Sequence, residues 1–171
     1  MKIGVLASGN LGFDLIKKIE SKYSISFALT DSGSEPIIKY CKKMKFPLFI
    51  GNPRNGNVRE FLINKFCDVL LSINFLYIIE KDLINFPSRY SINLHGSLLP
   101  KYRGRTPHIW AIINNEKKTG ITAHLINESC DTGDIIQQIE IPIENHDTGA
   151  DILKKFNPNY WILIKDILSK I

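Results

Sequence analysis

Short apolar runs alternate with helix-like segments along the first half of the chain. Strand-length runs of mostly apolar residues occur at residues 2–7, 25–30, 47–50, 69–73 and 90–94. Strands show this pattern when they are buried on both faces of a sheet. Helices are expected between them at residues 12–22, 36–45, 57–66 and 80–85. The alternation predicts an α/β, Rossmann-like fold, with a mostly parallel twisted sheet and helices on both faces.

A pair of strands in the second half departs from this pattern. Apolar runs at residues 121–126 and 135–141 are joined by the short segment Glu128–Asp134. Such a connection is too short for a crossover helix. The two strands are therefore expected to be antiparallel neighbours within the same sheet.

Capping signals mark several helix starts. Ser34 is expected to cap the second helix, and Thr106 to cap a helix over Pro107–Ile113. Thr148 and Asp151 have the spacing of a capping box at the start of a further helix.

Pro158 lies inside that last helical segment. Proline lacks the amide hydrogen that an interior helical turn requires, so we expect a break or kink at this residue. A separate apolar helix is then expected over residues 159–171.

Size and composition are those of an ordinary globular domain. The chain has 171 residues, of which 44% are hydrophobic and 23% charged. No apolar run approaches the roughly 20 residues of a membrane helix, so no membrane partner is expected. The formal net charge of +5 comes from scattered basic residues, which disfavours DNA binding. The widely spaced Cys41, Cys67 and Cys130 favour neither a disulfide framework nor a metal site, and indicate a reducing cytoplasm.

Candidate chemistry begins at the carboxyl end of the strand near residue 94. Asn93 and His95 are two residues apart, so strand alternation puts both side chains on the same side. Open α/β sheets bind ligands beyond the carboxyl ends of their strands. For an isolated Asn-x-His pair, two hydrogen-bonded core residues would be the better interpretation.

A second candidate is Asp131, in the loop between the two antiparallel strands. By itself, this residue is best interpreted as the start of an Asx-turn ahead of Gly133. His124, on the preceding strand, is interpreted as structural, because no other ionisable residue is expected near it.

The two segments together are far more specific. Ile92–Gly104 has the sequence Ile-Asn-Leu-His-Gly-Ser-Leu-Leu-Pro-Lys-Tyr-Arg-Gly, and Asp131–Ile135 has Asp-Thr-Gly-Asp-Ile. This combination resembles the formyltransferase family that uses 10-formyltetrahydrofolate. That family includes glycinamide ribonucleotide, methionyl-tRNA and sugar N-formyltransferases. The resemblance covers about residues 1–143 and is strongest over 91–141.

The resemblance implies roles for individual residues. The family's Asn-x-His falls on Asn93 and His95, and its catalytic aspartate on Asp131. Asn93 and a protonated His95 would donate hydrogen bonds to a tetrahedral oxyanion, while Asp131 would raise the pKa of His95 and help to move the amine proton. The folate supplies the formyl group, and no metal is needed. The matching pterin-binding regions contain Phe75, Leu76, Tyr77 and Ile78, together with Ile126, Asn127, Glu128, Ser129 and Cys130.

The acceptor follows from a finer resemblance. The segment Lys101–Trp110 is more similar to sugar N-formyltransferases than to glycinamide ribonucleotide enzymes. A nucleotide-linked amino sugar is therefore the expected acceptor, with methionyl-tRNA and glycinamide ribonucleotide as alternatives. The residues expected to contact it are Ser8, Gly9 and Asn10 of the first turn, with Arg103 and Arg105. A homodimer is left open.

The resemblance also gives a domain organisation. We expect residues 1–150 to form the formyltransferase catalytic domain and residues 151–171 a helical tail, with no separate second domain.

The first turn of the chain is also compatible with a different class of function. The glycine-containing turn Ser8–Gly12 and Asp31 after the second strand are also found in nucleotide-binding Rossmann modules and oxidoreductases. However, this turn is not Gly-x-Gly-x-x-Gly, and a single glycine turn is a weak signal.

Overall fold

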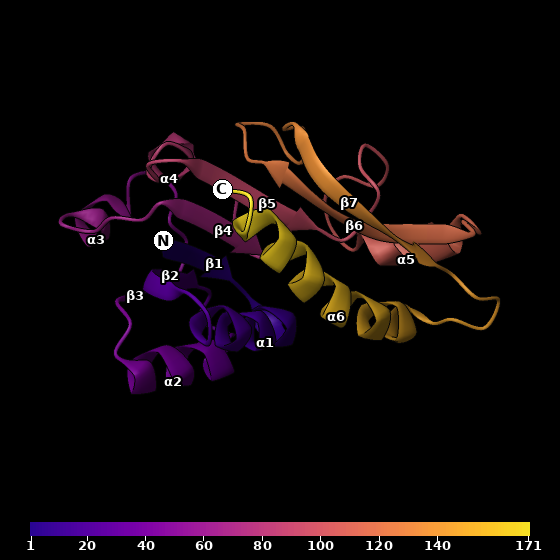
Figure 1. Cartoon of the computed structure of the whole chain (residues 1–171), viewed down its shortest axis with the longest axis horizontal. Coiled ribbons are helices and arrows are strands. Elements are labelled where there is room, and N and C mark those ends of the chain that lie inside the picture. The colour runs from indigo at the N-terminus through magenta and orange to yellow at the C-terminus, as the bar shows by residue number, and fades with distance from the viewer. The chain divides into compact units, whose positions relative to one another are not determined.

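The computed structural model describes every residue from Met1 to Ile171 (Figure 1). The strands are β1 (Lys2–Ala7), β2 (Ser24–Thr30), β3 (Leu48–Ile50), β4 (Val69–Ile73), β5 (Tyr90–His95), β6 (Lys118–Leu125) and β7 (Ile135–Pro142). The helices are α1 (Gly9–Glu20), α2 (Glu35–Met44), α3 (Arg59–Leu62), α4 (Lys81–Ile84), α5 (Pro107–Ile113) and α6 (Gly149–Leu168).

The strands belong to a 7-stranded sheet with the order β3-β2-β1-β4-β5-β6-β7. The chain divides into two compact units, Met1–Ile92 and Asn93–Ile171. We call them the amino-terminal and carboxyl-terminal units.

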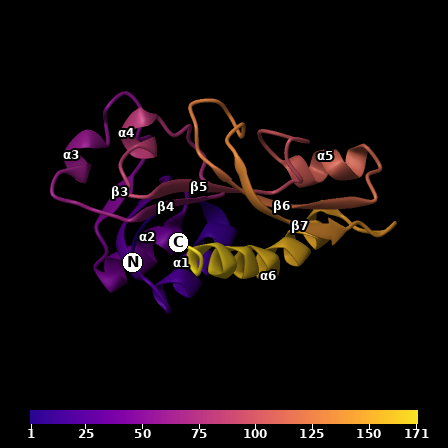
Figure 2. The same cartoon turned by 45° about the horizontal axis from the view of Figure 1, so that its top comes forward.

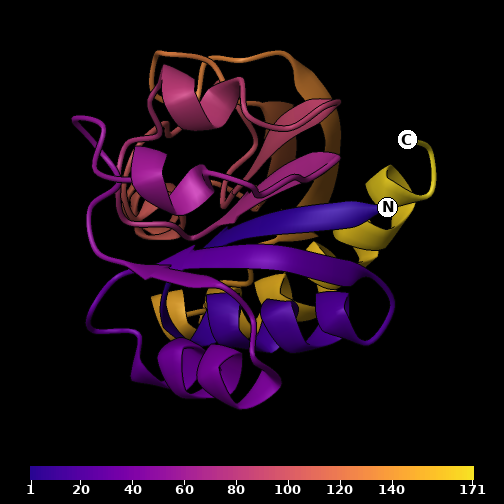
Figure 3. The same ribbon diagram turned by 90° about the vertical axis from the view of Figure 1, so that its left-hand side faces the viewer.

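The amino-terminal unit is a parallel sheet covered by helices on both faces. Strand β1 pairs in parallel with β2 and β4, and β2 pairs in parallel with β3. Helices α1 and α2 cover one face of these strands, and α3 and α4 lie on the other (Figure 3). Because both faces are covered, the strands are apolar at successive positions, as the sequence pattern predicted.

Aromatic packing fills the core of this unit. The fully buried Phe27 ring makes edge-to-face contacts with Phe61 and Phe86, at centroid distances of 6.0 and 5.6 Å. Gly4 of β1 lies directly beside this ring, and a Cβ there would come within 2.6 Å of Phe27. The glycine is therefore required by the close approach of an aromatic side chain to the strand.

The carboxyl-terminal unit contains the antiparallel pair. Strands β6 and β7 pair with Ile121 opposite Ile139, which confirms the prediction from the short connection between them. Helix α6 packs along this pair (Figure 2). Its buried residues are Ile152, Phe156, Tyr160, Leu163, Ile164, Ile167 and Leu168.

The expected interruption of the last helix was wrong. Helix α6 runs continuously from Gly149 to Leu168 with Pro158 inside it. Buried side chains lie on both sides of the proline, so the packing of one uninterrupted apolar face outweighs the lost hydrogen bond. The side-chain amide of Asn159 also donates to the Lys155 carbonyl at 2.8 Å.

The capping predictions had mixed outcomes. The capping box is confirmed, because Thr148 accepts from the Asp151 amide and Asp151 accepts from the Thr148 amide. Ser34 and Thr106 occupy N-cap positions, but neither side chain caps its helix. Ser34 donates instead to Asp31 at 2.6 Å, and Thr106 adopts a left-handed backbone conformation.

One predicted helix is much shorter than expected. The segment predicted to be helical over 57–66 is helical only over Arg59–Leu62. Ile63 leaves the helix with ψ of 132°, and Asn64 has a positive φ of 60°.

Candidate active site

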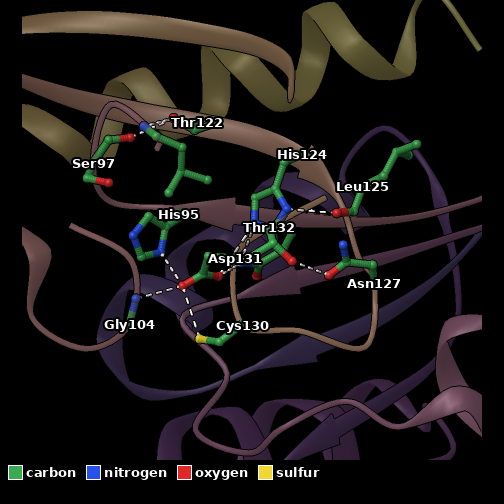
Figure 4. A network of polar contacts seen from close by, with 12 residues as sticks. His95, Ser97, Gly104, Thr122, His124, Leu125, Asn127, Cys130, Asp131 and Thr132 are labelled. Carbon is green, nitrogen blue, oxygen red and sulfur yellow. Dashed lines mark hydrogen bonds and ion pairs between the residues drawn. The ribbon is translucent and has the colours of Figure 1, made fainter. Parts of the chain in front are cut away.

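Two side chains from the end of β5 meet one carboxylate from the β6–β7 loop. Asn93 Nδ2 lies 3.2 Å from Asp131 Oδ1, and His95 Nδ1 lies 3.4 Å from Asp131 Oδ2. His95 is buried, with 7% of its surface exposed, and the Asp131 side chain is 12% exposed. Strand alternation thus brings Asn93 and His95 to one side, as expected. The loop supplies Asp131, which faces His95 (Figure 4).

Asp131 is the centre of the polar network. Its Oδ2 accepts the Gly104 amide hydrogen at 2.8 Å and faces the Cys130 thiol at 3.4 Å (Figure 4). The backbone of Asp131 has a positive φ of 50°, a rare conformation that here turns the carboxylate toward the two strands. Burial alone would raise the pKa of Asp131. Contacts with His124, His95 and the Gly104 amide outweigh it and hold that pKa well below its usual range.

The Asx-turn expected at Asp131 is made by another residue. Asn127 Oδ1 accepts from the Ser129 amide at 3.1 Å and from the Thr132 hydroxyl at 2.8 Å. Asn127 therefore stabilises the loop, and the carboxylate of Asp131 is available for the network.

His95 has a hydrogen-bond acceptor at each ring nitrogen. Its Nε2 lies 2.8 Å from the Tyr102 carbonyl, and Nδ1 faces Asp131. A carbonyl oxygen can only accept, so Nε2 carries a hydrogen. Burial lowers the pKa of His95 and is the strongest influence. The charge of Asp131 and the Tyr102 carbonyl act in the opposite direction.

His124 is a member of the site that sequence reasoning missed. Its Nε2 lies 3.1 Å from Asn93 Nδ2 and 3.5 Å from Asp131 Oδ1, so the interpretation of an isolated structural histidine was wrong. Its Nδ1 lies 2.7 Å from the Leu125 carbonyl, which can only accept, so Nδ1 carries a hydrogen and the ring is held in place from that side. The available signal was the position of His124 at the carboxyl end of the strand that leads to Asp131.

The Ser-Leu-Leu-Pro segment has a structural role. Ser97 is fully buried, and its hydroxyl donates to the Lys101 carbonyl at 2.6 Å. Thr122 of β6 donates to the Ser97 carbonyl and accepts from the Leu99 amide. These bonds fix the start of the loop that continues to Gly104, whose amide reaches Asp131.

The basic residues of this loop are not equivalent. Lys101 Nζ lies 2.8 Å from Glu116 Oε1 and is therefore paired. Arg103 and Arg105 flank Gly104, are exposed, and form no ion pair or hydrogen bond within the chain. Two free guanidinium groups thus lie on either side of the residue that contacts Asp131.

The first turn of the amino-terminal unit is a separate polar cluster. The Gly9 amide donates to Ser34 Oγ at 2.9 Å, and Asn74 Nδ2 donates to the Ser8 carbonyl at 3.1 Å. Asp31 accepts from both Ser34 and the Gly33 amide. Its carboxylate is therefore already engaged, which argues against the dinucleotide-binding alternative. Asn10, in α1, is exposed.

The residues expected to hold the pterin fall in two loops. Phe75, Leu76, Tyr77 and Ile78 follow β4 in the amino-terminal unit, where the Phe75 and Tyr77 rings make an edge contact. Leu76 and Ile78 are exposed. Ile126–Cys130 lies in the β6–β7 loop of the carboxyl-terminal unit, and Cys130 is exposed beside Asp131.

No group of three or more His, Cys, Asp or Glu side chains is arranged to hold a metal ion. None of the helices is long and apolar enough to cross a membrane.

The fold is that of formyl transferases, and the chain belongs to that family. The family model described as "Formyl transferase" matches residues 51–167. The chain is 36% identical over 167 residues to the bifunctional polymyxin resistance protein ArnA of Wigglesworthia glossinidia brevipalpis, covering 91% of this chain and 25% of that protein. It is 30% identical over 171 residues to a methionyl-tRNA formyltransferase of Clostridioides difficile (strain 630), covering 91% and 54%.

Solved structures show the same fold. A phosphoribosylglycinamide formyltransferase from Bacillus halodurans superposes with a TM-score of 0.85 and 24% identity, covering 99% of this chain and 96% of that one. A sugar 3N-formyl transferase, WlaRD, crystallised with dTDP and 5-N-formyl-THF, gives a TM-score of 0.77 and 24% identity, covering 99% and 62%. The predictions of the α/β fold and of the formyltransferase family are thus confirmed.

The relatives differ in length and in acceptor. The chain spans about a quarter of ArnA and 54% of the Clostridioides enzyme. Formyltransferases of this family use 10-formyltetrahydrofolate, which agrees with the predicted co-substrate. One relative is named for polymyxin resistance, and the others for methionyl-tRNA, phosphoribosylglycinamide or sugar acceptors. Family membership therefore does not select one acceptor.

Proposed function

We propose that this chain transfers the formyl group of 10-formyltetrahydrofolate to the primary amine of a nucleotide-linked amino sugar. The observation that carries the proposal is the convergence of Asn93, His95 and Asp131 in one buried network. Between them, an amide, an imidazole and a carboxylate can stabilise an oxyanion and move a proton, which serves an acyl transfer between nitrogens without a covalent intermediate.

The proposed chemistry assigns a role to each side chain. The acceptor nitrogen forms a bond to the formyl carbon, and the bond from that carbon to N10 of the folate then breaks. Asn93 and His95 donate hydrogen bonds to the oxyanion that develops on the formyl oxygen. Asp131, directly or through water, takes the proton that the amine loses, and a proton is delivered to N10 as the folate departs.

The geometry leaves room for this exchange of partners. The contacts of Asp131 with Asn93 and His95 are 3.2 and 3.4 Å, which is long for charge-assisted hydrogen bonds. A developing oxyanion can therefore take either donor from the carboxylate. Catalytic hydrogen bonds commonly shorten only when the substrate is bound.

The charge pattern of the 101–105 loop supports a phosphate-bearing acceptor. Lys101 is neutralised by Glu116, whereas Arg103 and Arg105 are exposed and unpaired. An arginine presents a planar fork that binds two phosphate oxygens at once. The diphosphate of a nucleotide sugar supplies such oxygens next to the sugar amine.

The direct test is an acceptor panel. The purified chain would be incubated with 10-formyltetrahydrofolate and, in parallel, a dTDP- or UDP-linked amino sugar, glycinamide ribonucleotide or methionyl-tRNA. We expect a mass increase of one formyl group on a nucleotide sugar only. Methionyl-tRNA is the second candidate, because relatives at 30% identity are methionyl-tRNA formyltransferases. Formylation of the tRNA alone would replace the sugar acceptor in this proposal.

Catalytic variants test the assignment of the site. Asn93→Ala and His95→Ala should each reduce turnover by about 100-fold or more, since each removes a donor to the transition-state charge. Circular dichroism should show an unchanged fold in both variants. Turnover within threefold of the parent value in both would contradict the assignment.

A further inference from the structure

A backbone carbonyl in an unusual conformation holds one side of His95. Tyr102 has a positive φ of 57°, which is rare for an aromatic residue. This conformation directs its carbonyl at His95 Nε2, 2.8 Å away. Residues in such conformations persist only where surrounding contacts determine them, and they concentrate at functional sites.

The contact that holds Tyr102 comes from Glu116. The Tyr102 hydroxyl and the Lys101 ammonium both donate to Glu116 Oε1, each at 2.8 Å. On the other side, Ser97 Oγ donates to the Lys101 carbonyl at 2.6 Å. The turn at residues 101–102 is therefore fixed from two directions. Ser97 acts on its backbone, and Glu116, together with the neighbouring Asn114, acts on the tyrosine side chain.

Glu116 is well placed for this role. It lies between α5 and β6, and its own amide donates to the Ala111 carbonyl at 3.0 Å, so its backbone is fixed by the end of α5. Its side chain is 26% exposed, compared with 62% for Glu140, which also pairs with a lysine. The hydrogen bonds from Lys101 and Tyr102 lower the pKa of Glu116, so it is a carboxylate at neutral pH.

We propose that Glu116 is a positioning residue for formyl transfer, which acts through Tyr102 to hold a backbone carbonyl against His95 Nε2. This inference rests on the proposed catalytic role of His95. None of the atoms of Glu116 contacts the reacting groups in the proposed chemistry. Its effect is to fix the orientation of the imidazole and which of its nitrogens carries a hydrogen.

The consequence for His95 has a definite sign. With the carbonyl held in place, Nε2 keeps its hydrogen and Nδ1 faces the negative charge of Asp131. Both contacts raise the pKa of His95 and oppose burial, which is the stronger influence and lowers it. Two other ionisable groups face the site. His124 acts against protonation of His95, and the Cys130 thiol contacts Asp131. If the Tyr102 carbonyl moves away, the neutral ring can carry its hydrogen on Nδ1 instead, and His95 titrates at a lower pH.

The test compares four variants of the full chain. Glu116→Ala should lower kcat about tenfold and leave the KM of each substrate within about twofold, because it misplaces a catalytic group without touching either substrate. NMR of the imidazole nitrogens should show His95 titrating at a lower pH than in the parent.

Glu116→Gln keeps an oxygen that accepts from Tyr102 and should restore most of kcat. Tyr102→Phe should lower kcat to a similar extent as Glu116→Ala. The double variant Glu116→Ala/Tyr102→Phe should have a kcat no lower than that of either single variant.

Glu140→Ala is the matched control. It removes a carboxylate that pairs with Lys118 at 2.6 Å on the β6–β7 strands and that has no contact with the site. It should leave kcat and the His95 titration unchanged.

Two outcomes would overturn the proposal. One is a Glu116→Ala variant with parental kcat and parental His95 titration. The other is a loss of activity that accompanies a lower melting temperature and is not restored by Glu116→Gln, which would show a general structural role. Failure of the proposed function looks different from either outcome. In that case the parent itself transfers no formyl group, and the NMR titration of His95 still reports on its contact with the Tyr102 carbonyl.

Discussion

Asp131 has contacts with more members of the site than any other residue described there. Its two oxygens face Asn93, His95, His124 and the Gly104 amide. A carboxylate held by so many donors remains charged over the whole physiological range, in agreement with its lowered pKa. The charge of this residue is therefore the feature to remove in a test.

Asp131→Asn keeps the shape of the side chain and removes its charge. The charge of Asp131 raises the pKa of His95, so the variant should have a lower His95 pKa than the parent. If protonated His95 is the active form, activity disappears as pH rises through that pKa, and the alkaline limb of kcat/KM should move to lower pH. Turnover at neutral pH should fall by about 100-fold. An NMR titration that shows an unchanged or higher His95 pKa would contradict this role.

Cys130 offers a chemical test of the adjacent loop. The thiol is exposed, and burial together with the neighbouring Asp131 raises its pKa, so alkylation should become faster as the pH is raised. The bulk of the adduct should weaken binding of a folate analogue at least about tenfold, or about 1.4 kcal/mol. Calorimetry before and after alkylation measures this change.

The other two cysteines provide the control for that experiment. Cys41 and Cys67 are fully buried, and burial raises the pKa of Cys41 to about 11 and that of Cys67 to about 12. Mass spectrometry should find a single adduct, on Cys130. Unchanged folate binding by this singly labelled protein would show that the loop does not line the folate site.

At the scale of elements, the 101–105 loop joins the end of β5 to α5 and carries the cations proposed to meet the acceptor. Its conformation is fixed by hydrogen bonds of Ser97 and Thr122 and by the pairing of Lys101 with Glu116, so Arg103 and Arg105 need not hold it in place. Free arginines on a loop that is already rigid can bind a ligand with little ordering cost.

Arg105→Ala tests this loop. The variant should raise the KM of a nucleotide sugar about fivefold to tenfold, equivalent to about 1 to 1.4 kcal/mol, and leave that of the folate unchanged. Added salt should weaken acceptor binding in the parent more than in the variant, because exposed charges are screened. Arg59→Ala, which removes an arginine paired with Asp82 in the amino-terminal unit, is the control. A raised KM for folate alone would place the loop at the other substrate.

Helix α6 shows how packing overrides a local signal. Pro158 is exposed, so its ring contributes little to the buried face, while its nitrogen cannot donate to the preceding turn. Pro158→Ala should therefore raise the free energy of unfolding by about 1 kcal/mol. This is less than the roughly 3 kcal/mol by which proline, compared with alanine, disfavours an interior helical position. Urea denaturation followed by circular dichroism measures the change.

The control for this substitution lies on the same helix. Ile162 is 51% exposed, so Ile162→Ala gains less helix propensity than Pro158→Ala and also removes apolar atoms that are half-buried. A Pro158→Ala variant that is less stable than both the parent and Ile162→Ala would mean that the proline is required for the course of α6.

At the scale of the whole molecule, the fold class was predictable because it depends on repeated, local patterns. Buried parallel strands must be apolar at successive positions, and the sequence shows this at β1, β2 and β4. The short β6–β7 connection fixed the direction of those two strands. The motif around Asn93, His95 and Asp131 gave the family that the comparisons confirm.

The sequence by itself determined the strands and their order of appearance, because hydrophobic period is a property of neighbouring residues. The candidate catalytic residues came from the resemblance of two sequence motifs to the formyltransferase family. Only the tertiary structure decided that His124 belongs to the network, that Glu116 reaches Tyr102, and that Arg105 is unpaired while Lys101 is not. These facts depend on contacts between residues at least 14 positions apart in the sequence, and on which carboxylate pairs with which cation. The uninterrupted course of α6 was also decided by tertiary contacts. The stabilisation from burying one continuous apolar face depends on what the helix packs against, and the presence of Pro158 in the sequence does not reveal those partners.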